Sequence, residues 1–249
     1  MVRRFACGLA LLCSSTFLHV PAQAQTQAQT RGVVELFTSQ GCSSCPPADK
    51  LLAELASDPS LVVISVPIDY WDYLGWKDTL ASPRNSARQK AYAHVRGDGQ
   101  VYTPQAVVNG SVHALGSDKA AIERAIAKSR QSGAMSLAPV TLAPAQGRIG
   151  IAVPGVEGLP SNAEAWLCGL TRTATVIIAR GENKGRTITY HNVVRRWVKL
   201  GDWTGHPASW SIPVQSLAAD GIDEVAVLLQ TGTMEKPKAI LGAAFAAVH

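Results

Sequence analysis

The chain has 249 residues, and its 23 basic and 18 acidic side chains give a formal net charge of +5 at pH 7. The basic residues are scattered, so no run of Lys and Arg resembles a nucleic-acid-binding surface, and we expect no nucleic-acid partner. No run of apolar residues is long enough to predict a stable membrane span. The length is enough for one large hydrophobic core or for two modest ones.

The N-terminus has the order of parts found in a secretory signal peptide. Arg3 and Arg4 precede an apolar stretch, and Ala22-Gln23-Ala24 offers the small residues of a cleavage site. We therefore predict a signal peptide over residues 1–24 and a periplasmic or secreted mature protein; an uncleaved anchor or tail is the alternative. Cleavage removes two positive charges and lowers the net charge from +5 to +3.

Residues 25–31 are rich in Gln, Thr and Ala and are predicted to be a flexible lead-in. The region 32–132 then alternates strand and helix patterns in the order β-α-β-α-β-β-α. This order predicts a small sheet with a parallel pair of strands, helices on both faces and a closing hairpin at Asn109-Gly110. The predicted strands are 33–38, 61–66, 105–108 and 112–115, and the predicted helices are about 48–55, 83–95 and 118–130.

The remainder, residues 133–249, has short β-type runs separated by Gly, Pro, Asn and Asp, without helical patterns between them. Such a series predicts an all-β domain of sandwich-like architecture. The predicted strands are 148–153, 163–170, 175–179, 187–194, 208–212, 224–229 and 239–244.

Cys42 and Cys45 lie between the first predicted strand and the first predicted helix. A Cys-x-x-Cys pair in this position indicates a redox centre, and cysteine pairs of exported proteins tend to form disulfides. The helix N-terminus is expected to stabilise a Cys42 thiolate and to lower its pKa to roughly 5–7.5, while Cys45 resolves the mixed disulfide. An inert disulfide is one alternative, and copper capture with a histidine such as His113 is another. We expect no cofactor and no resident metal.

Several motifs resemble one known family. They run from Val34 to Asp49 around the cysteines, from Asp69 to Asp78, from Val101 to Gln105, and over Gly181-Glu182-Asn183. Together they are similar to the secreted thioredoxin-like proteins of domain-of-unknown-function family 1223, over nearly the whole mature chain. The resemblance implies an α/β thioredoxin-like N-terminal domain followed by an all-β, sandwich-like C-terminal domain. It implies no particular substrate.

The resemblance also implies roles for residues beside the cysteines. Thr103-Pro104 matches a loop in which thioredoxin-like folds carry a cis proline next to the redox pair, so that the Thr103 backbone can pair with an extended substrate. Glu35 is a candidate for a buried acid that assists proton transfer near Cys45. A carboxylate that faces solvent or forms a salt bridge is the alternative.

These patterns predict a thiol–disulfide oxidoreductase that acts on exported cysteine-containing proteins or on a redox partner protein. The alternative is a non-catalytic secreted binding protein that captures a partner or copper on a thioredoxin-like scaffold. The remaining Cys168 is expected to be a buried, inert thiol. The aromatic residues at 70, 71, 73 and 76 are either a docking surface or ordinary buried side chains.

Overall fold

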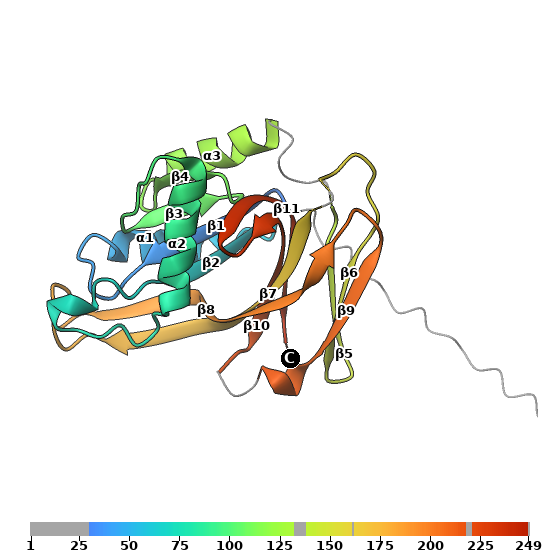
Figure 1. Ribbon diagram of the computed structural model, residues 1–249. Helices are drawn as coiled ribbons and strands as arrows, with labels where there is room; N and C mark the ends of the chain where they lie inside the picture. Colours follow the sequence, from blue (N-terminus) through green and yellow to red (C-terminus); the bar gives the residue numbers. More distant parts are fainter. Residues whose placement is uncertain (1–29, 132–137, 161, 218–220, 249) are drawn as a thin grey trace, which may run out of the picture.

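A computed structural model describes residues 30–131, 138–160, 162–217 and 221–248 (Figure 1). Its centre is a mixed sheet of eight strands in the order β11-β10-β7-β8-β2-β1-β3-β4. A separate three-stranded sheet has the order β5-β6-β9. No helix within these described ranges is both long and apolar enough to cross a membrane.

Within the described ranges, the first half of the chain supplies four strands of the large sheet and three α-helices. β1 and β2 are parallel, β3 is antiparallel to β1, and β4 closes the hairpin at the sheet edge. The predicted parallel pair and the predicted hairpin are therefore confirmed. The elements are β1 (Gly32–Thr38), α1 (Pro46–Leu55), β2 (Leu61–Pro67), a 3-10 turn (Asp72–Leu74), α2 (Pro83–Arg96), β3 (Gln105–Val108), β4 (Val112–Leu115) and α3 (Lys119–Gln131).

The side chains of β1 alternate between two buried faces, because successive residues of a strand point to opposite sides of the sheet. Val34 and Leu36 pack with α1 and α3 in one apolar cluster. Val33 and Phe37 pack on the other face, with Tyr92 of α2. This alternation decides which residues of β1 can approach the cysteines at the start of α1.

The second half adds four more strands to the same sheet. β7 and β8 form a long antiparallel hairpin, and β8 pairs in parallel with β2 through Ser65 and Val193. Figure 1 shows this hairpin, in yellow and orange, reaching past the end of the first-half strands. The elements are β5 (Thr141–Ala145), β6 (Arg148–Val153), β7 (Ala163–Ile177), β8 (Thr187–Trp203), β9 (Ala208–Pro213), β10 (Glu224–Thr233) and β11 (Lys236–Ala247), with a 3-10 turn at Val214–Ser216.

The predicted fold class, an α/β thioredoxin-like domain plus a separate all-β sandwich-like domain, is wrong. The structure is mostly β, with three α-helices in its described part and one mixed sheet that draws four strands from each half. The physical reason is that β8 uses the open edge of β2 for pairing, so the second half extends the first sheet. The predicted boundary between 132 and 133 lies outside the described residues.

Candidate redox site

Cys42 and Cys45 form a disulfide, with their Cα atoms 5.4 Å apart. We call residues 39–45 the cysteine turn; it joins β1 to α1, and Cys45 is the N-cap residue of the helix. Both cysteines are buried, with exposed fractions of 1% for Cys42 and 0% for Cys45, whereas Ser43 and Ser44 between them are exposed. A reacting group therefore approaches the disulfide from the side of the two serines.

Few backbone donors are free at this helix N-terminus. Pro46 and Pro47 occupy the first two helical positions and carry no N–H group. The Cys45 N–H donates to the Cys42 carbonyl oxygen at 3.2 Å. The Ser44 hydroxyl lies 3.4 Å from the Cys42 sulfur. The N-terminus consequently offers a Cys42 thiolate less hydrogen bonding than an ordinary helix start would.

A buried carboxylate lies one helical turn after Cys45. The Asp49 N–H donates to the Cys45 carbonyl oxygen, and the Asp49 side chain accepts a 2.8 Å hydrogen bond from the Thr38 hydroxyl. Its second oxygen, Oδ2, is buried and has no hydrogen-bond partner among the described residues. Burial raises the pKa of Asp49 to about 7, with the Thr38 hydrogen bond opposing and the nearby charge of Asp78 adding to the rise.

Glu35 does not fit the predicted role of proton acceptor near Cys45. It points to the α2 face of the sheet, opposite the face that packs on α1. There it forms a fully buried ion pair with Arg88, with Nε–Oε2 at 2.6 Å and Nη2–Oε1 at 2.9 Å. Tyr92 donates to the same carboxylate, and Gln230 of β10 binds both Arg88 and Tyr92. Strand alternation is the reason: Glu35 and Thr38 have opposite parity on β1, and it is the Thr38 hydroxyl that binds Asp49 of α1.

Thr103 and Pro104 lie beside the cysteine turn. The Thr103–Pro104 peptide bond is cis, as the resemblance implies. The Ser44 hydroxyl donates to the Thr103 carbonyl oxygen at 3.5 Å, and the Trp71 indole N–H donates to the Thr103 hydroxyl at 2.7 Å. Pro104 is buried next to Gly116, and a Cβ atom at Gly116 would lie 3.1 Å from Pro104 and 3.3 Å from Ala48 of α1.

The aromatic loop, which we define as residues 69–78 between β2 and α2, holds the cysteine turn from a second side. Gln40 is fully buried; its N–H donates to Asp78 and its side-chain oxygen accepts from the Trp76 indole N–H, both at 2.8 Å. Trp71 packs so closely on Gly41 that a side chain there would clash with the Trp71 Cβ. Tyr73 stacks on Trp71 with ring centres 6.4 Å apart and is 78% exposed. The aromatic loop is therefore partly a support for the turn and partly an exposed surface beside it.

The hairpin tip, which we define as residues 178–186 between β7 and β8, holds the turn from a third side. The Asn183 side-chain amide donates to the Gln40 and Cys42 carbonyl oxygens at 2.9 and 2.8 Å. The Ser43 N–H donates to the Glu182 carboxylate at 3.2 Å. Residues about 140 positions apart in the sequence thus meet at the disulfide.

Other candidate groups lie elsewhere. Cys168 is a buried free thiol, as predicted, and burial raises its pKa. His113 contacts Tyr102 and Asp98. Among the described ranges, no group of three or more His, Cys, Asp or Glu is arranged to hold a metal ion.

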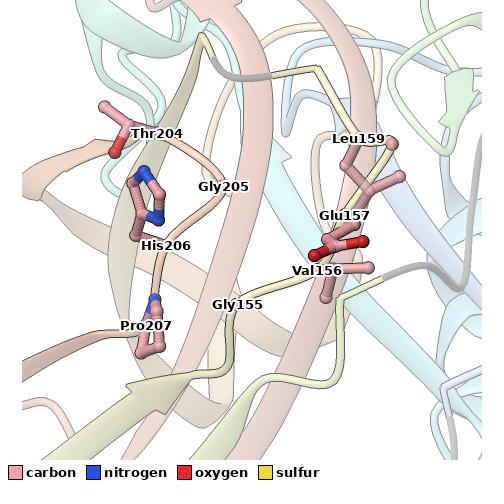
Figure 2. A pocket seen from close by; sticks show the side chains of 9 residues that line it. Gly155, Val156, Glu157, Leu159, Thr204, Gly205, His206 and Pro207 are labelled. Atoms are coloured by element: carbon pink, nitrogen blue, oxygen red, sulfur yellow. The ribbon is translucent and has the colours of Figure 1, made fainter.

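A hollow of about 410 Å³ lies in the second half between loops 155–159 and 204–207. Figure 2 shows Glu157 and His206 on facing sides of it. No cysteine lines this hollow, so it is separate from the disulfide site.

Residues 33–230 match the family described as Protein of unknown function (DUF1223). The chain belongs to this family. Among solved structures, an X-ray crystal structure of a protein from Agrobacterium tumefaciens is similar, with 35% sequence identity and a TM-score of 0.78. The similarity covers 90% of this chain and 96% of the other chain. No curated protein sequence matches the chain.

The structure brings together Cys42, Cys45, Thr103 and Pro104, and it places Glu35 apart from them. Sequence reasoning missed Asp49, Gln40 and Asn183. A polar residue among the apolar positions of the first helix was a usable signal for Asp49. Asn183 lies in the motif Gly181-Glu182-Asn183, but nothing in the spacing of this motif locates it at the cysteines.

Proposed function

We propose that this protein is a thiol–disulfide oxidoreductase that acts on exported proteins through Cys42 and Cys45. The observation that carries the proposal is the disulfide at the entry to α1 with a buried, partly unpartnered carboxylate, Asp49, one turn behind Cys45. A structural disulfide requires no such acid, and burying one without full hydrogen bonding has an energetic cost. Clusters of this kind are typical of functional sites.

The chemistry follows from the order of the two sulfurs. In the reduced protein, Cys42 lies at the exposed serines and attacks one sulfur of a substrate disulfide, which releases the other sulfur as a thiolate. Cys45 then loses its proton and attacks the Cys42 sulfur of the mixed disulfide. This second attack releases the substrate as its second thiol and leaves Cys42–Cys45 oxidised. Two electrons have then passed from the protein to the substrate, and the same steps in reverse donate a disulfide.

Asp49 replaces Glu35 as the acid of this mechanism. A carboxylate that titrates near pH 7 is suited to accept the Cys45 proton near neutral pH, since efficient general bases have pKa values close to the working pH. Thr38 orients one carboxylate oxygen and leaves Oδ2 free to take the proton. Thr103 and Pro104 are proposed to form the neighbouring surface on which an extended substrate segment lies.

A non-catalytic secreted binding protein is the second candidate, and one observation favours it. Both sulfurs are almost completely buried, which is the state of an inert structural disulfide. A binding role predicts that the disulfide resists reduction and that its loss affects only stability.

The two candidates are separated by cysteine variants assayed with an unfolded, disulfide-containing protein substrate. The Cys45→Ser variant should accumulate a mixed disulfide through Cys42, visible as a covalent adduct that dithiothreitol releases, whereas Cys42→Ser should abolish both adduct and exchange. The Cys168→Ser variant is the matched control and should exchange normally. If no adduct forms and exchange is no faster than in a reaction without the protein, the catalytic proposal fails and the binding role remains.

A further inference from the structure

Three contacts tie the hairpin tip to the cysteine turn. Asn183 is fully buried and uses its amide group to bind the carbonyls on either side of Gly41, and Glu182 binds the backbone N–H next to Cys42. Two backbone hydrogen bonds close the tip: the Ile178 N–H donates to the Arg186 carbonyl oxygen, and the Gly185 N–H donates to the Ile178 carbonyl oxygen. The tip is therefore a firm support for the turn.

Glu182 affects the two redox states of the pair differently. The disulfide is neutral, whereas the reduced pair must carry a negative charge on Cys42 when it is reactive. A carboxylate bound to the Ser43 N–H repels that charge, and it also occupies a donor that a thiolate would otherwise use. The prolines at the helix start remove two further donors, and burial of Cys42 disfavours its charged form.

The other charges around the turn do not reverse this effect. Asp49 of α1 and Asp78 of the aromatic loop are both buried and are potentially negative. The tip also carries Arg180, Lys184 and Arg186, but these side chains are exposed. Within the described residues, none of the three makes a hydrogen bond or ion pair to the cysteine turn.

Asn183 acts on the same equilibrium through geometry. By fixing the Gln40 and Cys42 carbonyls, it holds the backbone in the conformation in which the two sulfurs can bond. Holding reacting groups in place raises their effective concentration and favours bond formation between them. Both tip residues thus favour the disulfide over the dithiol.

We propose that Glu182 and Asn183 are positioning residues that stabilise the oxidised pair and make this site a reductant of protein disulfides. Strong oxidants of this chemistry owe their potential to a stabilised reduced form, and here the reduced form is disfavoured instead. The reduced pair transfers two electrons and two protons to a substrate disulfide, giving two substrate thiols and the Cys42–Cys45 bond. A dithiol protein in the same compartment must then return the electrons. The assignment of the site as a reductant rests on the proposed function.

The test measures the equilibrium of the pair with a glutathione redox buffer, for the full mature chain. Glu182→Gln preserves the shape of an exposed side chain, and Glu182→Lys reverses its charge. The equilibrium constant should shift toward the dithiol by about two- to fivefold for Glu182→Gln, which is about 10–20 mV at 29.6 mV per tenfold. Glu182→Lys should shift it further, and both shifts should shrink in high salt. Glu157→Gln, an exposed acid in the second-half loop, is the matched control.

Two further measurements separate electrostatics from simple loosening. The helix N-terminus alone predicts a Cys42 pKa of roughly 5–7.5, but the prolines and the Glu182 carboxylate oppose that effect, so we expect the pH midpoint of Cys42 alkylation at or above about 8.5 in the wild type instead. The midpoint should fall in the order wild type, Glu182→Gln, Glu182→Lys. Asn183→Ala should also move the equilibrium toward the dithiol, but with little change in the alkylation midpoint. Unchanged equilibrium in all three variants, or a wild-type midpoint well below 8.5, would overturn the proposal.

Failure of the proposed function has a different signature. The glutathione equilibrium and the alkylation midpoint need no protein substrate, so they test the role of the tip even if exchange with proteins is absent.

The direction of electron transfer is tested separately. The reduced protein with excess dithiothreitol should accelerate reduction of insulin, and the oxidised protein should not oxidise a dithiol peptide. Net oxidation of the peptide would contradict the reductant role alone.

Discussion

The hydroxyl of Thr38 donates a hydrogen bond to the Asp49 carboxylate across 2.8 Å, in the interior of the protein. Thr38 is the last residue of β1, and Asp49 lies one turn into α1, so the bond spans the cysteine turn that joins the two elements. It partly compensates the burial that raises the pKa of Asp49 to about 7. The acid is therefore held in one orientation and remains able to titrate near neutral pH.

Asp49 should make the stability of the protein depend on pH. Because its pKa is about 7 in the folded state and about 3.9 in the unfolded chain, the folded state binds the proton more tightly. Stability should fall as the pH rises from about 4 to about 7, and the loss should persist above pH 7. Asp49→Asn keeps the acceptor for Thr38 and should stabilise the protein at pH 8 by roughly 1–4 kcal/mol, with little effect near pH 4. Urea unfolding at both pH values checks this; an equal change at both would contradict it.

The same variant should slow the resolving step. Without a carboxylate to accept the Cys45 proton, the mixed disulfide should persist about 100-fold longer at pH 7, and the defect should narrow at higher pH as the thiol ionises by itself. Rapid acid quenching with mass spectrometry measures the lifetime of the adduct. The control is Glu54→Gln, which removes an exposed carboxylate of α1. Glu35→Gln is not used as a control because it disturbs the core. A lifetime equal to that of wild type would remove Asp49 from the mechanism.

The buried Glu35–Arg88 pair is expected to matter for stability and not for exchange. Glu35→Gln leaves the Arg88 guanidinium buried without its counter-charge, and we expect a loss of about 3–5 kcal/mol in the free energy of unfolding. The double variant Glu35→Gln, Arg88→Met removes both charges and should recover part of this loss. Chemical denaturation measures both effects. If folded Glu35→Gln protein shifted the reduction potential of the cysteines, the assignment of Glu35 to structure alone would be wrong.

Gly110 should be intolerant of a side chain for two reasons. It has a positive φ of 70°, and a Cβ atom there would overlap the carbonyl oxygen of Lys238 in β11. Gly110→Ala should therefore destabilise the protein by more than about 1 kcal/mol. Gly147→Ala is the control, because Gly147 has a similar φ of 73° but open space around it. A comparable loss in both variants would show that backbone conformation, not contact with β11, is the cause.

Export is predicted from the N-terminal residues alone. If residues 1–24 are a signal peptide, the mature protein should begin at Gln25 and be recovered from the periplasm or the medium. N-terminal sequencing of protein from each cell fraction measures this. Recovery of a chain that begins at Met1 from the cytoplasm would contradict both the export and the proposed substrates.

Local patterns in the sequence predicted much of the secondary structure. The strands at 105–108 and 112–115 agree with β3 and β4, since Asn109-Gly110 specifies a tight turn through its own backbone preferences. The pair Cys42–Cys45 was also predictable, because its two members are one turn apart.

By contrast, 163–170 and 175–179 were predicted as two strands but form the single strand β7. The polar residues between them resemble a loop, yet they lie on an exposed part of a continuous strand. β5 was missed because its sequence, with Pro144, has little β pattern.

What the sequence determined by itself was therefore what neighbours along the chain decide: turn chemistry, strand and helix periodicity, and the spacing of the cysteine pair. The tertiary structure decided that β8 joins β2, that Glu35 faces Arg88 instead of the cysteines, and that Asn183 reaches Cys42. Glu35 and Arg88 are 53 positions apart in the sequence, and Cys42 and Asn183 are 141 positions apart. A hydrogen bond between distant residues depends on how whole elements pack, and no local propensity encodes it.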